Sequence, residues 1–138
     1  MCSEKEGRIN AAESKNCPIA VNLIAHLEEM VGFNEPDFLI ELLDTYLEDS
    51  ARTIKLLPQA WQKQNMFDVL RAAHSLKSAS ATLTAAKLEL LTTQLETEMR
   101  GGATGLDIGD QIEQIIAEFH RVYAALLIER AKLAKQLS

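Results

Sequence analysis

Residues 67–85 read FDVLRAAHSLKSASATLTA, and the spacing of apolar residues in this stretch identifies the kind of fold. Apolar or small side chains recur every three or four residues, as they do on one face of a helix. They are Val69, Ala72, Ala73, Leu76, Ser80 and Leu83. Asn65, followed three residues later by Asp68, resembles a helix start. The stretch therefore predicts a helix that begins near Asn65.

Four further segments show the same spacing, namely Leu23–Val31, Leu39–Leu57, Leu88–Met99 and Ile108–Leu137. No segment alternates apolar and polar residues as a half-buried strand would. We expect an all-α fold, an antiparallel up-and-down four-helix bundle with an additional short N-terminal helix and a long C-terminal helix.

The expected helix boundaries rest on turn-forming residues. Pro58 predicts a kink or a brief break within the second helix, after which Trp61 continues the apolar phase. Arg100 followed by two glycines is typical of a helix end, and Asp107 is a candidate cap for the last helix. That helix is long enough for its end, residues 128–137, to overhang the bundle and support self-association.

Two regions are expected along the chain. Residues 1–16 are polar and form a flexible N-terminal tail, with a short helix through Ile9–Ala12 as the alternative. Residues 17–138 form one helical-bundle domain.

The composition excludes several classes of protein. The 138 residues carry a formal charge of −6, which argues against a nucleic-acid partner. No apolar run approaches the roughly 18 residues of a membrane span, and no signal peptide opens the chain. Cys2 and Cys17 are expected to be thiols rather than a disulfide framework. These features predict a soluble, cytoplasmic protein.

His74 is expected to face solvent. Successive residues of a helix are about 100° apart, which places His74 about 150° from the middle of the apolar face. Phe67, Leu70, Arg71, Lys77, Ser78 and Ala81 share its outward surface. Such a surface suits a partner that approaches an imidazole carrying an anion. From this geometry alone, an incidental surface histidine remains the more common alternative.

The other polar residues suggest no chemistry. His26 and His120 are expected at the surface or at a boundary, and the chain lacks the Glu-x-x-His pairs of di-iron bundles. The segment TQLETEMR, residues 93–100, is expected to be a solvated helix face. Tyr46 and Trp61 are expected to pack between helices.

The stretch around His74 resembles the histidine phosphotransfer (HPt) domains of two-component phosphorelays. Their signature is roughly A-H-x-L-K-G-x-x-x-x-x-G-A. The chain matches it at Ala73, His74, Leu76, Lys77 and Ala85. The similarity extends over about residues 22–127. Ser78 and Thr84 stand where the family commonly has glycine.

The resemblance implies a function. His74 would accept a phosphoryl group from a receiver-domain aspartate and pass it to another receiver. Lys77 would neutralise phosphoryl charge, assisting transfer more than folding. Phe67, Leu70, Arg71, Ser78 and Ala81 would dock the receiver. Ser78 is still small, so close approach remains feasible, while Thr84 should alter how its helix ends.

The partners implied are response-regulator receiver domains and a hybrid sensor histidine kinase, with no nucleic acid and no membrane. The protein would be a phosphoryl carrier rather than an enzyme, without its own ATP site. It would need no cofactor, and Mg²⁺ would be held by the receiver. The alternative is a non-phosphorylating helical adaptor that docks receivers.

Overall fold

The computed structural model describes residues 17–32, 35–102 and 106–137. The described helices are α2 (Leu23–Val31), α3 (Pro36–Gln62), α4 (Met66–Thr82), α5 (Ala86–Arg100) and α6 (Leu106–Leu137). Within these ranges no strand occurs, which confirms the all-α prediction. Residues 1–16 lie outside the described part, so the division into tail and domain stays a prediction.

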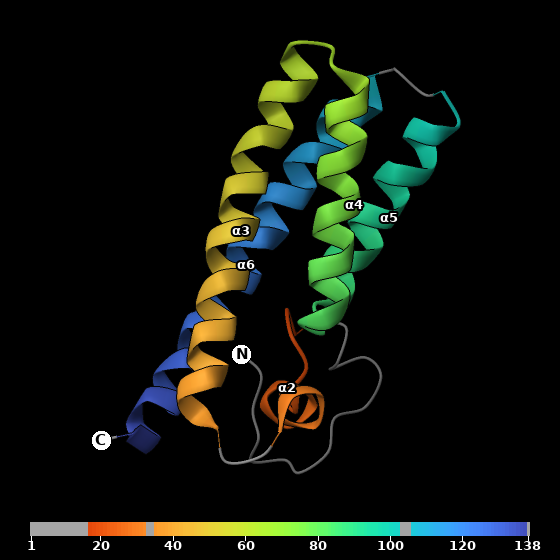
Figure 1. Cartoon of the computed structure of the whole chain (residues 1–138). Helices are drawn as coiled ribbons and strands as arrows, with labels where there is room; N and C mark the ends of the chain where they lie inside the picture. The colour runs from red at the N-terminus through yellow and green to blue at the C-terminus, as the bar shows by residue number, and fades with distance from the viewer. Residues whose placement is uncertain (1–16, 33–34, 103–105, 138) are drawn as a thin grey trace.

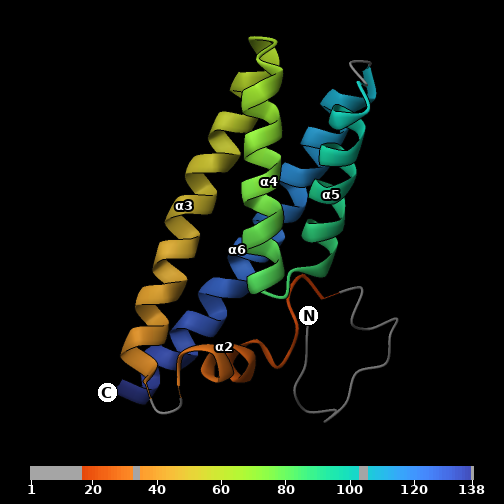
Figure 2. The same cartoon turned by 45° about the vertical axis from the view of Figure 1, so that its right-hand side comes forward.

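The four long helices lie side by side (Figure 1). Helix α3 packs against α4 and α6, and α5 packs against the same two helices. In Figure 1 the chain rises along α3, descends along α4, rises along α5 and descends along α6. Helix α2 lies crosswise below α4 and α5, next to the first turns of α3 (Figure 2).

One hydrophobic core joins all five described helices. The apolar positions that the sequence spacing singled out are buried in it, for example Leu23 and Leu27 of α2, Leu43 of α3, and Ile115 of α6. Tyr46 and Trp61 are half-buried against this core, as expected. Met30 is the exception in the first helix, because 55% of it is exposed.

The helix ends show how the sequence sets the connections. The Asn65 side chain accepts a hydrogen bond from the Asp68 backbone N–H, which confirms the predicted start of α4. Helix α5 ends at Arg100 before two glycines, also as predicted. Asp107 is not a cap, because it lies inside the first turn of α6.

Two of the tight turns share one design. Gln64 and Thr84 both have a φ of +57° and lie in the left-handed region. The next residue then closes the preceding helix, since the Asn65 N–H donates to Ala60 and the Ala85 N–H donates to Ser80. This is the hydrogen bonding of a Schellman helix end, in which the left-handed position is usually glycine.

Two expectations about local structure need correction. The brief break expected as one alternative at Pro58 does not occur, because α3 continues through it to Gln62, while the alternative of a kink stays a prediction. Cys17 is not a free thiol, because it is disulfide-bonded, and its bonding partner lies outside the described residues.

The end of α6 extends beyond α4 and α5 but stays beside α3 (Figure 1). The Arg130 guanidinium donates two hydrogen bonds to the Asp44 carboxylate of α3, at 2.6 and 3.0 Å. Leu133, further along, is only 2% exposed and belongs to the core. The predicted overhang is therefore attached to α3 on one side, while Ile128 and Leu137 stay exposed, and its role in self-association stays a prediction.

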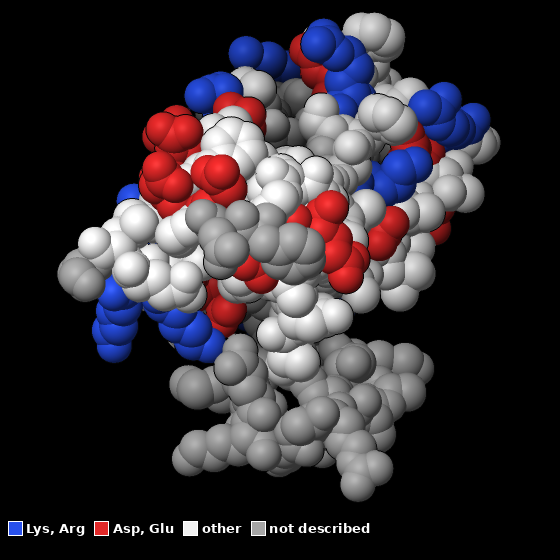
Figure 3. Space-filling view, turned by 60° about the horizontal axis from the view of Figure 1, so that its bottom comes forward, with Lys and Arg blue, Asp and Glu red and all other residues white. Residues whose placement is uncertain are grey.

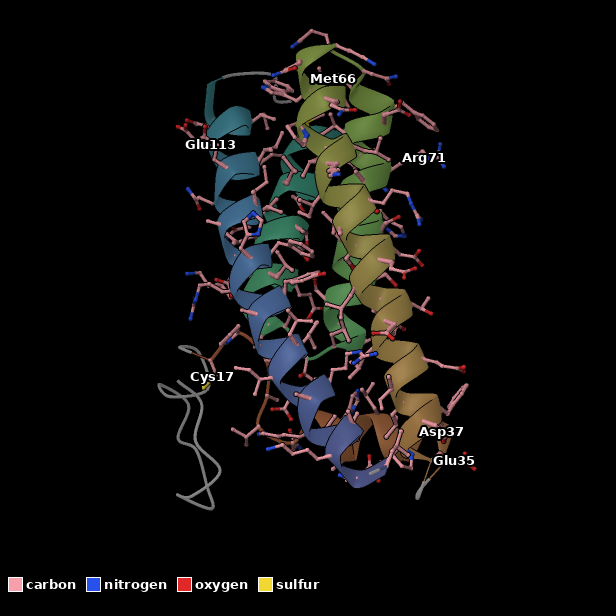
Figure 4. All side chains as sticks on the ribbon, turned by 90° about the vertical axis from the view of Figure 1, so that its left-hand side faces the viewer. Cys17, Glu35, Asp37, Met66, Arg71 and Glu113 are labelled. Atoms are coloured by element: carbon pink, nitrogen blue, oxygen red, sulfur yellow. The ribbon has the colours of Figure 1, made fainter. Side chains whose placement is uncertain are left out.

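The end of the molecule that carries α2 has its own charge pattern. In Figure 3, which looks toward that end, Asp and Glu side chains gather near the middle of the face, and Lys and Arg lie around its margin. Glu35 and Asp37, at the start of α3, are exposed at this end, opposite Met66 (Figure 4).

Candidate functional site

His74 lies at the middle of α4 with its ring toward solvent. Its side chain is 62% exposed, which agrees with the outward direction expected from helical spacing. Ala73 on one side is completely buried, so the backbone at this position is fixed while the imidazole stays accessible.

The imidazole is held by a carboxylate of the next helix. Nδ1 of His74 lies 2.9 Å from Oε2 of Glu96, which belongs to α5. The Glu96 side chain is only 7% exposed. The expectation that residues 93–100 form a solvated face is therefore wrong at Glu96, whose carboxylate is covered by the two helices.

Two cations share the same carboxylate. The Lys77 ammonium donates to Oε1 of Glu96 at 2.6 Å, and the Arg100 guanidinium donates to Oε2 at 3.2 Å. The hydrogen bond from Lys77 is the main cause that holds the pKa of Glu96 at about 2, below the ordinary 4.5. Burial opposes this shift, while the bonds from His74 and Arg100 add to it. Glu96 is therefore an anion at neutral pH.

Since an ionised carboxylate can only accept hydrogen bonds, the contact with Glu96 assigns the proton of a neutral His74 to Nδ1. Nε2 then carries the lone pair, and it has no hydrogen-bond partner among the described residues. The nucleophilic nitrogen of the ring is the one that faces away from Glu96.

The predicted docking residues lie on the accessible side of α4. Phe67 is 68% exposed, and Arg71, Ser78 and Ala81 are exposed too, while Leu70 is half-buried. The Arg71 guanidinium lies over the Phe67 ring, 5.8 Å from its centroid. Arg71 therefore covers an aromatic surface and points outward beside α3 (Figure 4).

A groove of about 530 Å³ runs between α3 and α4 and reaches His74. Its α4 side is formed by His74 and by small residues such as Ser75, Ser78 and Ala79. Its α3 side includes Asp49 and Arg52, which pair with each other at 3.1 Å. The groove is open and leads to the imidazole from the side opposite α5.

The other two histidines lie at the surface or at a boundary, where the sequence analysis expected them. His120 is exposed and His26 is half-buried, and neither belongs to a charged cluster. In the described part of the chain, no group of three His, Cys, Asp or Glu side chains is arranged to hold a metal ion. None of the described helices has the length and apolar character needed to cross a membrane.

Sequence reasoning missed Glu96 and Arg100. The position of Glu96 near His74, though not the burial of its carboxylate, could have been inferred from the turn at Thr84, because two antiparallel helices place residues at similar distances from their connection side by side. His74 lies ten residues before Thr84, and Glu96 lies twelve after it. Glu96 is also at the edge of the apolar face formed by Leu88, Leu95 and Met99, with Arg100 one helical turn later.

Comparisons with known proteins agree with this geometry. A sequence model of the Hpt domain family matches residues 41–125, more than half of the chain. The fold is similar to the crystal structure of histidine-containing phosphotransfer protein B (HptB) from Pseudomonas aeruginosa PAO1. The TM-score is 0.74 at 28% identity, over 83% of this chain and 96% of that one. No curated protein sequence matches.

Members of the Hpt family carry phosphoryl groups between receiver domains and kinases of two-component systems, and do not have a complete catalytic site of their own. His74, Lys77, Glu96 and Arg100 lie within the matched range. This chain belongs to the Hpt domain family, and membership supports a histidine phosphotransfer role in a phosphorelay.

Proposed function

We propose that this protein is a phosphorelay intermediate that accepts a phosphoryl group on His74 and passes it on. The donor is an aspartyl phosphate of one receiver domain, and the acceptor is the aspartate of another. The observation that carries the proposal is the exposed imidazole whose Nδ1 contacts the buried Glu96 carboxylate at 2.9 Å. That contact leaves Nε2 as the attacking atom.

Lys77 and Arg100 supply the charge compensation in this mechanism. Phosphoryl transfer requires positioning and electrostatic stabilisation more than covalent help from the protein. Both cations contact Glu96, the residue that also contacts the His74 ring. The side chain of Lys77 is 31% exposed and that of Arg100 is 62% exposed. Their exposed N–H groups are therefore available to phosphoryl oxygens on Nε2 while the bonds to Glu96 remain. The Mg²⁺ ion of the reaction belongs to the receiver.

The scaffold and the partners complete the proposal. The scaffold is an antiparallel up-and-down bundle of the four long helices. The helix pairs that pack together and the path of the chain in Figure 1 support this arrangement. Response-regulator receivers and a hybrid sensor histidine kinase are the partners, in the cytoplasm, without nucleic acid or membrane. The receiver docks on Phe67, Leu70, Arg71, Ser78 and Ala81.

The test is transfer from a receiver labelled with radioactive phosphate. We expect acid-labile label on the wild type and none on His74→Gln, with the helical circular dichroism unchanged because the side chain is exposed. His120→Gln, which removes another exposed imidazole, is the matched control and should be labelled normally. Receiver binding without label on the wild type would instead identify a non-phosphorylating adaptor.

A further inference from the structure

Glu96 is held so that its carboxylate has little freedom to turn away from His74. Lys77 binds one carboxylate oxygen, and His74 and Arg100 bind the other. The side chain is 7% exposed, so water cannot readily replace these partners. The low pKa of Glu96 means that it stays an acceptor throughout the neutral range.

We propose that Glu96 is a positioning residue that keeps Nδ1 of His74 protonated before and after phosphorylation, which makes phospho-His74 a labile, fast phosphoryl donor. The inference rests on the proposed function and deepens it. It concerns how readily the phosphoryl group leaves, which the identification of His74 as the acceptor does not determine.

The bond changes balance without any proton transfer. On acceptance, the Nε2 lone pair forms the N–P bond while the P–O bond to the donor aspartate breaks and its electron pair stays on the carboxylate. The ring is then a cation, with the Nδ1 proton opposite Glu96. On donation, a receiver carboxylate oxygen attacks phosphorus, and the N–P electron pair returns to Nε2. The cationic ring is the better leaving group, since it departs as a neutral imidazole.

The other charged groups around the ring do not replace Glu96. Lys77 on α4 and Arg100 on α5 are cations, which disfavour a proton on the ring. Across the groove on α3, Asp49 is paired with Arg52, so this pair has little net charge. Arg71 is placed over Phe67. Among these neighbours, Glu96 is the acceptor in contact with Nδ1.

The substitution Glu96→Gln tests whether Glu96 keeps Nδ1 protonated or only holds the imidazole in place. A glutamine amide has a similar shape, but it can accept from a protonated Nδ1 or donate to a deprotonated one. The variant still holds the imidazole, yet it no longer retains the proton. Phospho-His74 of the variant should therefore lose its Nδ1 proton at a lower pH and become longer-lived.

The experiment labels the full chain with phosphoramidate, a small phosphoryl donor, and follows loss of phosphohistidine by ³¹P NMR as pH is raised. We expect the decline in hydrolysis rate to begin at least one pH unit lower in Glu96→Gln than in the wild type. At pH values between the two transitions, the variant should then hydrolyse about tenfold more slowly, because one pH unit is a tenfold change in proton occupancy. Glu113→Gln, an exposed carboxylate of α6 that points away from the helices in Figure 4, should match the wild type.

Identical pH profiles for the wild type and Glu96→Gln would overturn the inference while leaving His74 as the phosphorylated residue. Absence of label on His74 in the wild type, from phosphoramidate and from receiver alike, would instead overturn the proposed function. A second measurement uses the wild type alone and therefore tests the inference even if Glu96→Gln does not fold. ¹⁵N NMR of the phosphorylated wild type should show Nδ1 protonated well above neutral pH, and a deprotonated Nδ1 at neutral pH contradicts the proposal.

Discussion

Thr84 occupies a backbone conformation that β-branched residues rarely adopt, with a φ of +57°. Its hydroxyl accepts a hydrogen bond from the Ala20 N–H at 3.0 Å, which attaches the segment before α2 to the turn between α4 and α5. The residue that replaces the family's common glycine therefore adds a contact that glycine cannot make. The sequence predicted that Thr84 would alter the end of this helix, but not the contact with Ala20.

Two substitutions at Thr84 distinguish the effect of backbone strain on stability from the effect of the hydrogen bond with Ala20. Thr84→Ala loses the hydrogen bond and keeps the left-handed conformation, so we expect it to destabilise the fold by about 1 kcal/mol. Thr84→Gly also loses the bond but relieves about 1 kcal/mol of backbone strain, and should be close to the wild type. Urea unfolding of both variants checks this. Equal stabilities of the alanine and glycine variants would show that the backbone at Thr84 is unstrained.

The low pKa of Glu96 predicts how the stability of the fold changes in acid. Its pKa in the folded protein is about 2, below the ordinary 4.5, so its interactions stabilise the fold fully above the ordinary value. This stabilisation is lost as the pH falls from about 4.5 toward 2. In urea titrations over that window, the wild type should lose stability more steeply than Glu96→Gln. Parallel pH dependences for the two proteins would contradict the assignment.

We expect Lys77 to contribute to both transfer and stability. The sequence suggested a role mainly in transfer, but its ammonium also compensates a buried carboxylate at 2.6 Å. Lys77→Ala should slow transfer from the receiver and cost about 1–2 kcal/mol, because a charged hydrogen bond to a buried group is lost. Arg71→Ala removes a cation that contacts Phe67 instead, so transfer should decline less in this control.

The outward direction of His74 could be predicted, whereas the burial of Glu96 could not. Helical spacing fixes the direction of a side chain relative to its own helix, and that sufficed for an exposed imidazole. A glutamate at the edge of an apolar face can point to solvent or to the neighbouring helix. The choice depends on Lys77 and His74, which another helix supplies.

The far end of α6 is attached to α3 through Arg130 and Asp44. The hydrogen bond from Arg130 lowers the pKa of Asp44, and both side chains are more than a third exposed. A double-mutant cycle with Asp44→Asn and Arg130→Gln should give a coupling energy of about 0.5 kcal/mol, screened by salt. The more exposed Asp49–Arg52 pair, within one helix, should give a smaller value. A larger coupling for Asp49–Arg52 would mean that bidentate geometry contributes nothing.

The positions of the helices followed from apolar spacing because each helix buries one face in a common core. The continuity of α3 through Pro58 did not follow. Proline removes one hydrogen bond, but Leu57 and Ala60 on either side are buried and hold the last turn in helical form. The packing of these side chains outweighs the low helix propensity of proline. A single sequence does not reveal how such side chains pack.

At the scale of the whole molecule, the proposed docking face is the one where α3 and α4 border the groove that leads to His74. Ser78→Leu should raise a bulky side chain beside the imidazole and lower both receiver affinity and transfer rate by at least tenfold. Ala117→Leu adds comparable bulk at an exposed position of α6 and should leave both unchanged. Normal transfer in Ser78→Leu would place the receiver elsewhere on the protein. Fluorescence binding and label transfer measure the two quantities.

In the proposed mechanism, the residues that act on the phosphoryl group all come from α4 and α5, which are joined by the short connection at Thr84. The proposed chemistry then lies in one continuous stretch between His74 and Arg100, while α2, α3 and α6 support this stretch and α3 borders the groove beside it. The hairpin formed by α4 and α5 could be exchanged between bundles as one unit. Exchanging it between bundles would therefore move reactivity together with the α4 side of the docking surface, and only the α3 side of the groove would stay with the recipient.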